Sequence, residues 1–344
     1  MAIGIAVLGS GIIARNEHLP AIEACSLLSL KAVYSRSRLS ARNLAQDTKH
    51  SAKAYFDSPP IDGHSLDDLL GREDVDAVII ALPIQVQPGI IRRAIAARKH
   101  VLSERPIAED VETAEELIRW FREQSSKNLW SVGENFRFFE PLAFGAEQVR
   151  KMRGEVITFS VKMYDLIDKE DESCKTAWRQ DPEHQGGFLL DGGISFIAGL
   201  RSLLGAVGLE ITHVAAFTSL IKKHLAPSDT VHATVQINNG NSGTFSLSFG
   251  AEFKHAFEIQ VVTEKMVVTV RPTSVAMMTQ DNKRGQTSSF KSCTGIRQEV
   301  AAFAQSIKTG NVDSRGTPEQ ALMDLKVLQA MLESSKEAGK VKAV

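Results

Sequence analysis

Two glycines and an alanine near the start of the chain have the spacing that a bound pyrophosphate needs. Gly9, Gly11 and Ala14 directly follow the apolar run Ile3–Leu8, and apolar residues then recur at helical spacing as far as Ile22. In such a strand–turn–helix the first glycine permits a tight turn, the second lets the backbone approach the phosphates, and a small third residue allows close packing. The alternative is a tight turn without a ligand. The predicted cofactor contacts here are Gly9, Ser10, Gly11, Ile12 and Ile13.

The residues after the second apolar run, Leu28–Tyr34, indicate which dinucleotide binds. NAD-binding folds carry Asp or Glu about 20 residues after the glycines, where the acid binds the ribose 2′-hydroxyl. At that distance this chain has Ser35, followed by Arg36 and Ser37. An arginine with two hydroxyls can hold a 2′-phosphate through charge-assisted hydrogen bonds. The sequence therefore favours NADP(H), with a solvated basic turn as the alternative.

Three further segments fall at the carboxyl ends of predicted strands, which is where parallel sheets bind their ligands. They are Leu82-Pro83, Ser103-Glu104-Arg105-Pro106 and Glu134-Asn135. We expect the first two segments to contact the cofactor through Leu82, Pro83, Glu104 and Arg105. Asn135 is a predicted substrate contact.

Strands and helices alternate along residues 1–138, which predicts a Rossmann domain with a parallel sheet. The expected strands are Ile3–Leu8, Leu28–Tyr34, Ala52–Phe56, Ala77–Ala81, His100–Ser103 and Leu129–Gly133. Helices are expected after the glycine turn and over Leu66–Leu70, Val86–Ala97 and Val111–Ser125.

Residues 139–344 read instead as successive strands with turn signals between them. The expected strands are Val156–Tyr164, Ile211–Ser219, Thr230–Ile237, Ser242–Phe249, Ala256–Thr263 and Met266–Val270. Helices are expected over Gly192–Leu204, over Gln298–Lys308 and from Thr317-Pro318 onward, where the final helix can pack back on the first domain. The fold class is thus α/β, with an N-terminal Rossmann domain and a C-terminal α+β domain that contains a large, open, mainly antiparallel sheet. The polar stretch Asp165–Gln185 is expected to form a functional loop or lid, and Gly339–Val344 to fray.

Together these motifs resemble the Gfo/Idh/MocA oxidoreductases, the family of glucose–fructose oxidoreductase and inositol dehydrogenase. The resemblance covers nearly the whole chain. It is carried by the glycine turn, by Glu104-Arg105-Pro106 and by the segment from Gly186 to Ser195, with Trp178-Arg179 shortly before it. It implies a Rossmann domain followed by an open-sheet domain, and a nicotinamide cofactor that performs the hydride chemistry.

Three positions depart from the family pattern. Arg105 stands where the resemblance implies a lysine beside the reacting carbon, and an arginine keeps the charge but does not readily release a proton. Ser195 stands where it implies a histidine, and Ala198 where an aspartate often follows. Serine does not replace histidine as a general acid or base without an activating partner. These departures put simple alcohol dehydrogenation in doubt.

Five other residues near the motifs have side chains that could do chemistry. Asp191 keeps the family position, and its alternative role is to cap the following helix. Tyr164 ends a predicted strand and could donate a proton or pack at a rim. Trp178 and Arg179 could cover a planar or anionic ligand or anchor their loop, and His184 could exchange protons or be solvated. The predicted catalytic residues are Arg105, Asp191, Tyr164 and Ser195, and the predicted substrate contacts are Asn135, Trp178, Arg179 and His184.

Composition excludes other classes of function. Lys and Arg total 40 and Asp and Glu total 41, so a net charge of −1 gives no footprint for nucleic acid or an anionic membrane. No apolar run approaches the ~18 residues of a membrane span, and the N-terminus does not resemble a secretory signal. Cys25, Cys174 and Cys293 are far apart without metal-ligand spacing, so we expect no metal and a cytoplasmic location. The open sheet face, with the resemblance, predicts a homodimer or higher homo-oligomer.

Three functions remain open at this stage. The leading one is an NADP(H)-dependent oxidoreductase that reduces a C=O, C=N or activated C=C bond of a small organic substrate, because Arg105 supplies a cation and no base is evident. The second is a non-redox cyclase, isomerase or lyase on the same scaffold, since the proton-handling residues of the family are missing. The third is a non-catalytic NADP-binding regulator. Turnover without cofactor would favour the second, and binding without turnover the third.

Overall fold

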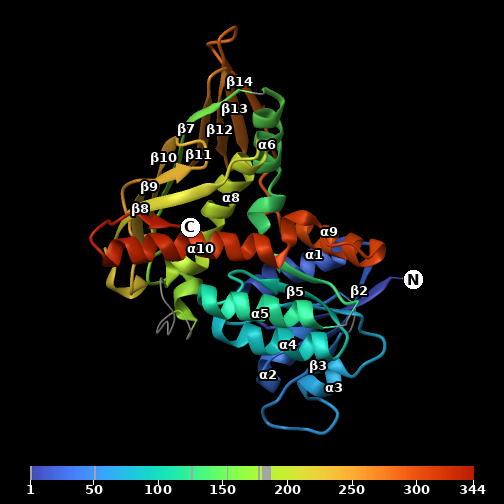
Figure 1. Ribbon diagram of the computed structural model, residues 1–344. Coiled ribbons are helices and arrows are strands. Elements are labelled where there is room, and N and C mark those ends of the chain that lie inside the picture. The colour runs from blue at the N-terminus through green and yellow to red at the C-terminus, as the bar shows by residue number, and fades with distance from the viewer. Residues whose placement is uncertain (1, 50–51, 125–126, 153, 177–178, 180–186) are drawn as a thin grey trace. The chain divides into compact units, whose positions relative to one another are not determined.

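The computed structural model (Figure 1) describes residues 2–49, 52–124, 127–152, 154–176, 179 and 187–344. By its internal contacts the chain divides into two units, Met1–Asn135 with Ile296–Leu322 and Phe136–Gly295 with Met323–Val344. The sequence placed a single boundary after residue 138. The division differs because the segment Ile296–Leu322 returns to the first unit.

The first unit contains the predicted Rossmann-type parallel sheet. Over the described residues its strand order is β3-β2-β1-β4-β5-β6. The strands are β1 (Ile3–Leu8), β2 (Leu28–Tyr34), β3 (Lys53–Tyr55), β4 (Ala77–Ile80), β5 (His100–Glu104) and β6 (Trp130–Gly133). The helices are η1 (Ala14–His18), α1 (Leu19–Ala24), α2 (Arg38–Gln46), α3 (Leu66–Leu70), η2 (Ile84–Val86), α4 (Gln87–Ala96), α5 (Val111–Glu123), α9 (Ile296–Thr309) and η7 (Ser314–Gly316). The strand order reverses between β1 and β4, and ligands of such sheets bind outside the carboxyl ends at this switch point.

The core of this unit forms because its central strands are apolar along their whole length. Ile5–Leu8 of β1 and the whole of β4 are fully buried, as a strand covered on both faces must be. Helix α9 adds Ile296, Val300 and Phe303 to the same core, at a spacing that puts them on one face of the helix.

The second unit is built on a large mixed sheet with the order β14-β13-β12-β11-β7-β10-β9-β8-β15 among the described residues. Its strands are β7 (Val156–Tyr164), β8 (Ile211–Ser219), β9 (Thr230–Ile237), β10 (Ser242–Ser248), β11 (Ala256–Thr263), β12 (Met266–Arg271), β13 (Ser274–Thr279), β14 (Gln286–Ser289) and β15 (Lys342–Ala343). The pairing is antiparallel except between β7 and β10, which run parallel. A hairpin joins β9 and β10 through residues 238–241.

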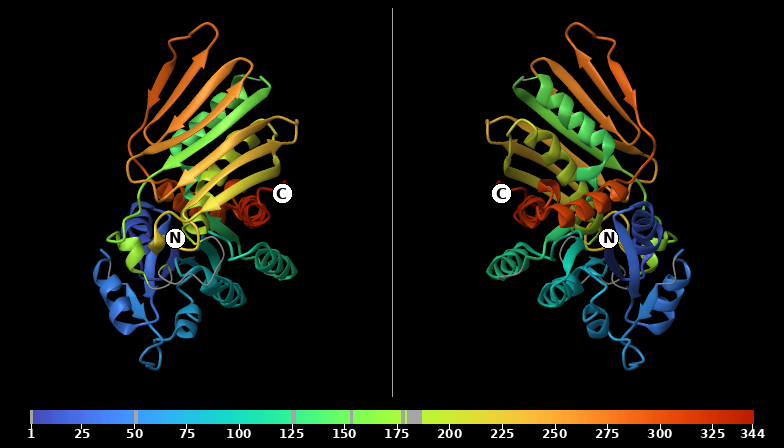
Figure 2. Two further views of the ribbon diagram at one scale, coloured as in Figure 1. Left: turned by 90° about the vertical axis from the view of Figure 1, so that its left-hand side faces the viewer. Right: turned by 90° about the vertical axis from the view of Figure 1, so that its right-hand side faces the viewer.

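Helices cover one face of this sheet, and the other face is not covered by any described helix of the unit (Figure 2). The unit's helical elements are η3 (Asn135–Phe138), α6 (Glu140–Met152), η4 (Glu172–Lys175), η5 (Leu189–Gly193), α8 (Ile194–Gly205), η6 (Lys223–Leu225) and α10 (Pro318–Lys336), η3 and α10 beginning in the first unit. Helices α6 and α8 pack on each other and on β12 and β11 respectively. Apolar side chains such as Phe245 and Leu247 face them and are buried, whereas Thr244 and Ser246 point to the opposite face. We call the uncovered side the open face.

Several elements differ from the sequence-based expectations. Helices α2 and α6 and strands β13, β14 and β15 were not expected. The last residues do not fray, because Lys342 and Ala343 pair with β8 and the Ser334 hydroxyl donates to the Lys340 carbonyl. Among the described residues no helix is long and apolar enough to cross a membrane.

Candidate functional site

The glycine turn of the first unit has the geometry that a phosphate cradle needs. Gly9 has φ +119°, and a side chain there would put Cβ 2.0 Å from the Ala81 carbonyl oxygen. Its N–H donates to the Tyr34 carbonyl at 2.9 Å, which ties the turn to β2. A Cβ added at Gly11, in contrast, would meet no atom within 4 Å. The space in front of Gly11 is therefore open to a pyrophosphate, and the predicted residues Ser10, Ile12 and Ile13 flank Gly11 in the chain.

The end of β2 lies against this turn. The Ser10 hydroxyl donates to Ser35 Oγ at 2.8 Å, so the two predicted cofactor segments meet. Arg36 is exposed, and its carbonyl accepts from the N–H groups of Asp57 and Ser58. Ser37 caps α2 by accepting from the Ser40 N–H at 3.2 Å. Ser37 therefore has a capping role that the sequence analysis did not assign.

An acid beside this corner, Asp57, is already engaged. Asp57 Oδ2 accepts from the Tyr34 hydroxyl at 2.5 Å, and Oδ1 accepts from the Leu66 N–H at 3.1 Å. Burial and this hydrogen bond raise the pKa of Tyr34 well above its usual range. Asp57 is thus held by the fold and is not arranged as a ribose acceptor.

The carboxyl ends of β5 and β6 bring together several charged groups. Glu104 Oε1 lies 2.6 Å from Nε2 of the buried His18 on η1. Arg105 Nε lies 3.9 Å from Glu134 Oε2, and the Glu134 side chain is 3% exposed. Leu82 and Pro83 follow the neighbouring strand β4. His18 therefore contacts a residue of the predicted cofactor site.

A further acid in this cluster was missed by the sequence analysis. Glu299 of α9 is 2% exposed, and a Cβ added at Gly133 would lie 3.3 Å from Glu299 Oε2. Burial, together with the nearby carboxylates Glu104 and Glu134, raises the pKa of Glu299 well above its usual range. The sequence spacing could have revealed Glu299. It shares one helix face with Ile296 and Phe303, so an acid falls within a buried apolar stripe.

In the second unit, Asp191 and Ser195 lie on one helical segment. Asp191 is in the π-helical turn η5, and Ser195 is buried in the first turn of α8. Asp191 Oδ2 accepts from Arg179 Nε at 2.6 Å, which joins two predicted site residues. Neither η5 nor α8 has a side-chain cap, so the alternative role of Asp191 as a helix cap is wrong. The helical run simply begins earlier, at Phe188.

Tyr164 lies on the other side of the sheet from these residues. It pairs with Ser248 and Ala256, whose side chains point to the open face, and the Lys254 ammonium lies 3.8 Å from its ring centroid. Phe257, which follows Ala256 in β11, points to the helix side and packs on Phe196 of α8. The structure therefore does not bring Tyr164 together with Asp191 and Ser195, because strand alternation sends their side chains to opposite faces.

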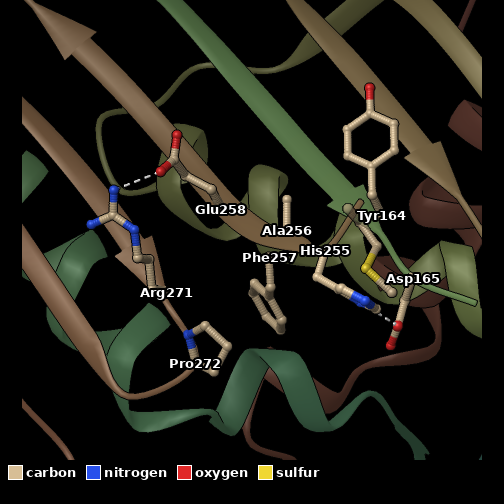
Figure 3. Close-up of a pocket in the computed structure, with 9 residues that line it drawn as sticks. Tyr164, Asp165, His255, Ala256, Phe257, Glu258, Arg271 and Pro272 are labelled. Atoms are coloured by element: carbon tan, nitrogen blue, oxygen red, sulfur yellow. Dashed lines mark hydrogen bonds and ion pairs between the residues drawn. The ribbon is translucent and has the colours of Figure 1, made fainter. Parts of the chain in front are cut away.

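A hollow of about 620 Å³ lies at the ends of β7, β11 and β12 (Figure 3). Two ion pairs border it, His255–Asp165 at 3.0 Å and Arg271–Glu258 at 2.7 Å. Of the predicted site residues that the structure describes, Tyr164 alone lines it. Asn135 begins η3 directly after Glu134, and Trp178 and His184 lie outside the described residues.

Comparison with known sequences decides the family. A family model of an NAD-binding Rossmann fold matches residues 3–133, and the C-terminal alpha/beta domain of the same oxidoreductase family matches residues 147–343. The chain belongs to the Gfo/Idh/MocA oxidoreductase family. Membership makes the chain an oxidoreductase with an NAD(P)-binding Rossmann unit, as the glycine turn and Glu104-Arg105-Pro106 had indicated.

Similar members of the Gfo/Idh/MocA family match over most of their length. The chain is 46% identical over 345 residues to dehydrogenase FPY6 of Fusarium mangiferae, with 99% of each chain covered. It is 30% identical over 256 residues to the dTDP-3,4-didehydro-2,6-dideoxy-alpha-D-glucose 3-reductase of Actinomadura kijaniata, covering 74% of this chain and 70% of that one. The crystal structure of an oxidoreductase from Thermotoga maritima, 27% identical, matches with a TM-score of 0.88 over 100% of this chain and 98% of that one.

Proposed function

We propose that this enzyme is an NADP(H)-dependent reductase of a C=O, C=N or activated C=C bond in a small organic substrate. The observation that carries the proposal is Arg105. It lies at the carboxyl end of β5 with Glu134 3.9 Å away, in the position where the family resemblance implies a lysine. A guanidinium keeps its positive charge at any working pH, so Arg105 serves as a fixed cation and not as a base.

The cofactor preference is argued from the end of β2. Ser35, Arg36 and Ser37 follow that strand, and Asp57, the neighbouring acid, is held by Tyr34 and Leu66. Arg36 and the hydroxyls would hold the 2′-phosphate, and the open space at Gly11 would admit the pyrophosphate. When bound, the dinucleotide supplies the hydride.

The contribution of the protein to the reaction is then electrostatic. In carbonyl reduction the carbon gains a hydride, which the dinucleotide would supply, and negative charge develops on the oxygen, which then takes a proton from water. A cation fixed beside that oxygen stabilises the developing charge without having to reorient. Arg105 itself neither gives nor takes this proton, because an arginine keeps its proton at any working pH.

The relative from Actinomadura kijaniata supports the direction of the reaction, because it is a reductase by name. Its substrate is a didehydro sugar carried on dTDP, and its reaction is a reduction at carbon 3. A keto group on a sugar ring is therefore the first class of substrate to examine.

The test is cofactor binding followed by a substrate screen. NADPH should bind more tightly than NADH, and NADPH should be consumed with at least one ketone, imine or enone. Arg105→Ala should retain NADPH binding within a fewfold and lose about a hundredfold or more in kcat. Arg93→Ala removes an exposed guanidinium from α4 and serves as the control. NADPH binding without consumption by any electrophile class would contradict the proposal.

A further inference from the structure

The buried acid of α9 has an environment that a structural role alone does not require. Glu299 is 2% exposed, and its Oε1 has no hydrogen-bond partner among the described residues. Its carboxylate receives the backbone N–H of Glu134 and lies against the end of β6, where Gly133 leaves the space for it. The flanking positions on the same face, Ile296 and Phe303, are apolar core residues. An apolar side chain would pack at position 299 without desolvating a carboxyl group.

The groups that face Glu299 come from three elements. Glu104 and Arg105 lie at the end of β5, Glu134 follows β6, and His18 of η1 contacts Glu104 at 2.6 Å. Three carboxyl groups therefore share one guanidinium in a region largely shielded from water. A third ionised carboxylate would be repelled by two others, and this cost is avoided when one of the three keeps its proton. Glu299 is the most buried of the three, and its pKa is raised accordingly.

We propose that Glu299 is a positioning residue of the cofactor site, which sets the charge facing the nicotinamide end of the bound dinucleotide and thereby the preference for its oxidised or reduced form. The inference rests on the proposed function, in that it requires NADP(H) to bind at the carboxyl ends of the strands. Glu299 acts through Glu104, Arg105 and Glu134 and need not touch the cofactor.

The sign of the effect follows from the charge of the nicotinamide. The oxidised ring is positively charged and the reduced ring is not, so added negative charge nearby favours NADP⁺ over NADPH. While Glu299 keeps its proton, this added charge is absent. As pH rises and Glu299 ionises, the ratio of Kd for NADP⁺ to Kd for NADPH falls. The phosphates are common to both forms, so their own titration cancels in the ratio.

The experiment measures that ratio as a function of pH, without any substrate. One unit of negative charge near the ring, screened at an effective dielectric constant of about 20, changes the ratio on the order of tenfold. We expect the wild-type ratio to fall by up to this amount as pH rises through the titration of Glu299. Glu299→Gln has the shape of the protonated acid and does not titrate, so its ratio should stay at the value that the wild type has below that titration. Glu123→Gln is the control, because it removes an exposed acid at the end of α5. Helix α5 runs back from the carboxyl edge of the sheet to the amino edge, so Glu123 lies away from the cofactor site and the variant should behave as wild type.

Three outcomes overturn the inference. A wild-type ratio that does not change with pH excludes a titrating group at the site. A slope that persists in Glu299→Gln but disappears in His18→Gln assigns the titration to the His18–Glu104 pair instead. Equal slopes in all variants assign it to a remote group. Failure of the proposed function is distinguishable, because in that case NADPH would bind without being consumed, or would not bind at all.

Discussion

Arg36 lies at the end of β2 with its side chain exposed, so its contribution to the fold is small and its contribution to a ligand can be isolated. The 2′-phosphate distinguishes NADPH from NADH at this corner. Arg36→Ala should therefore raise the Kd for NADPH by about tenfold, as expected for a partly solvated charge-assisted hydrogen bond. The Kd for NADH should remain within about twofold. Fluorescence titration of both cofactors measures the two effects.

The matched control is Arg42→Ala, which removes an equally charged, exposed side chain further along α2. A uniform change in net charge would weaken NADPH binding in both variants alike. Equal losses for NADPH and NADH in Arg36→Ala would contradict the assignment of Arg36 to the 2′-phosphate.

The candidate site could be predicted from sequence where spacing along one segment was sufficient. The glycine turn, Ser35–Ser37 and Arg105 each follow a buried strand directly, so the carboxyl edge of the sheet was evident from local pattern. Tyr164 could not be placed in this way. Its face depends on the register of β7 against β10 and β11, which is a long-range property. Glu299 was missed for the same reason, because its partners lie in segments far away in the sequence.

At the scale of elements, one buried carboxylate joins three helical segments of the second unit. Asp324 of α10 accepts from Arg137 of η3 at 2.6 and 2.7 Å, and from Arg201 of α8. Asp324 is 1% exposed. Asp324→Asn would leave two guanidinium groups without their anion, and we expect a loss of about 3–5 kcal/mol in the free energy of unfolding. Urea unfolding followed by circular dichroism measures it.

Glu319→Gln provides the comparison for Asp324→Asn. Glu319 begins the same helix and pairs with Arg122, and both side chains are largely exposed. Its removal should cost about 0–1 kcal/mol, because surface ion pairs contribute little. Similar losses in the two variants would show that the Asp324 contacts do not hold the helices together.

The elements that were missed from sequence have identifiable physical causes. β14 has the sequence Gln-Thr-Ser-Ser and is a strand only because β13 pairs with it. α6 contains Pro141 and Gly145, residues that disfavour helix, yet a Cβ at Gly145 would lie 2.7 Å from Val270 of β12. Packing against β12 thus requires a glycine at position 145, and this glycine lowers the helix propensity that a sequence-based prediction relies on. By contrast, β1, β2, β7, β8, β9 and β11 have the bounds that their apolar runs predicted.

At the scale of the whole molecule, the open face of the large sheet suggests how copies of the chain associate. Apolar side chains are exposed on it, including Phe217 at 63% and Met278 at 46%, among small polar residues such as Thr244 and Ser246. Small side chains leave a surface that a second sheet can approach closely. We expect a homodimer or higher oligomer through this face, with roughly 800 Å² buried per partner in a standard interface.

Ser246→Arg tests this arrangement, because it puts a long cation near the centre of the open face without disturbing the core. An isologous contact would bring two such arginines together, so the variant should sediment as a lower oligomer than the wild type at equal concentration. The monomer fold should persist, since position 246 points away from α6 and α8. Glu123→Arg, on an exposed position of the first unit, should leave the sedimentation coefficient unchanged. A wild-type protein that sediments as a monomer would show that the open face does not associate. An oligomer unaffected by Ser246→Arg would move the interface to another surface.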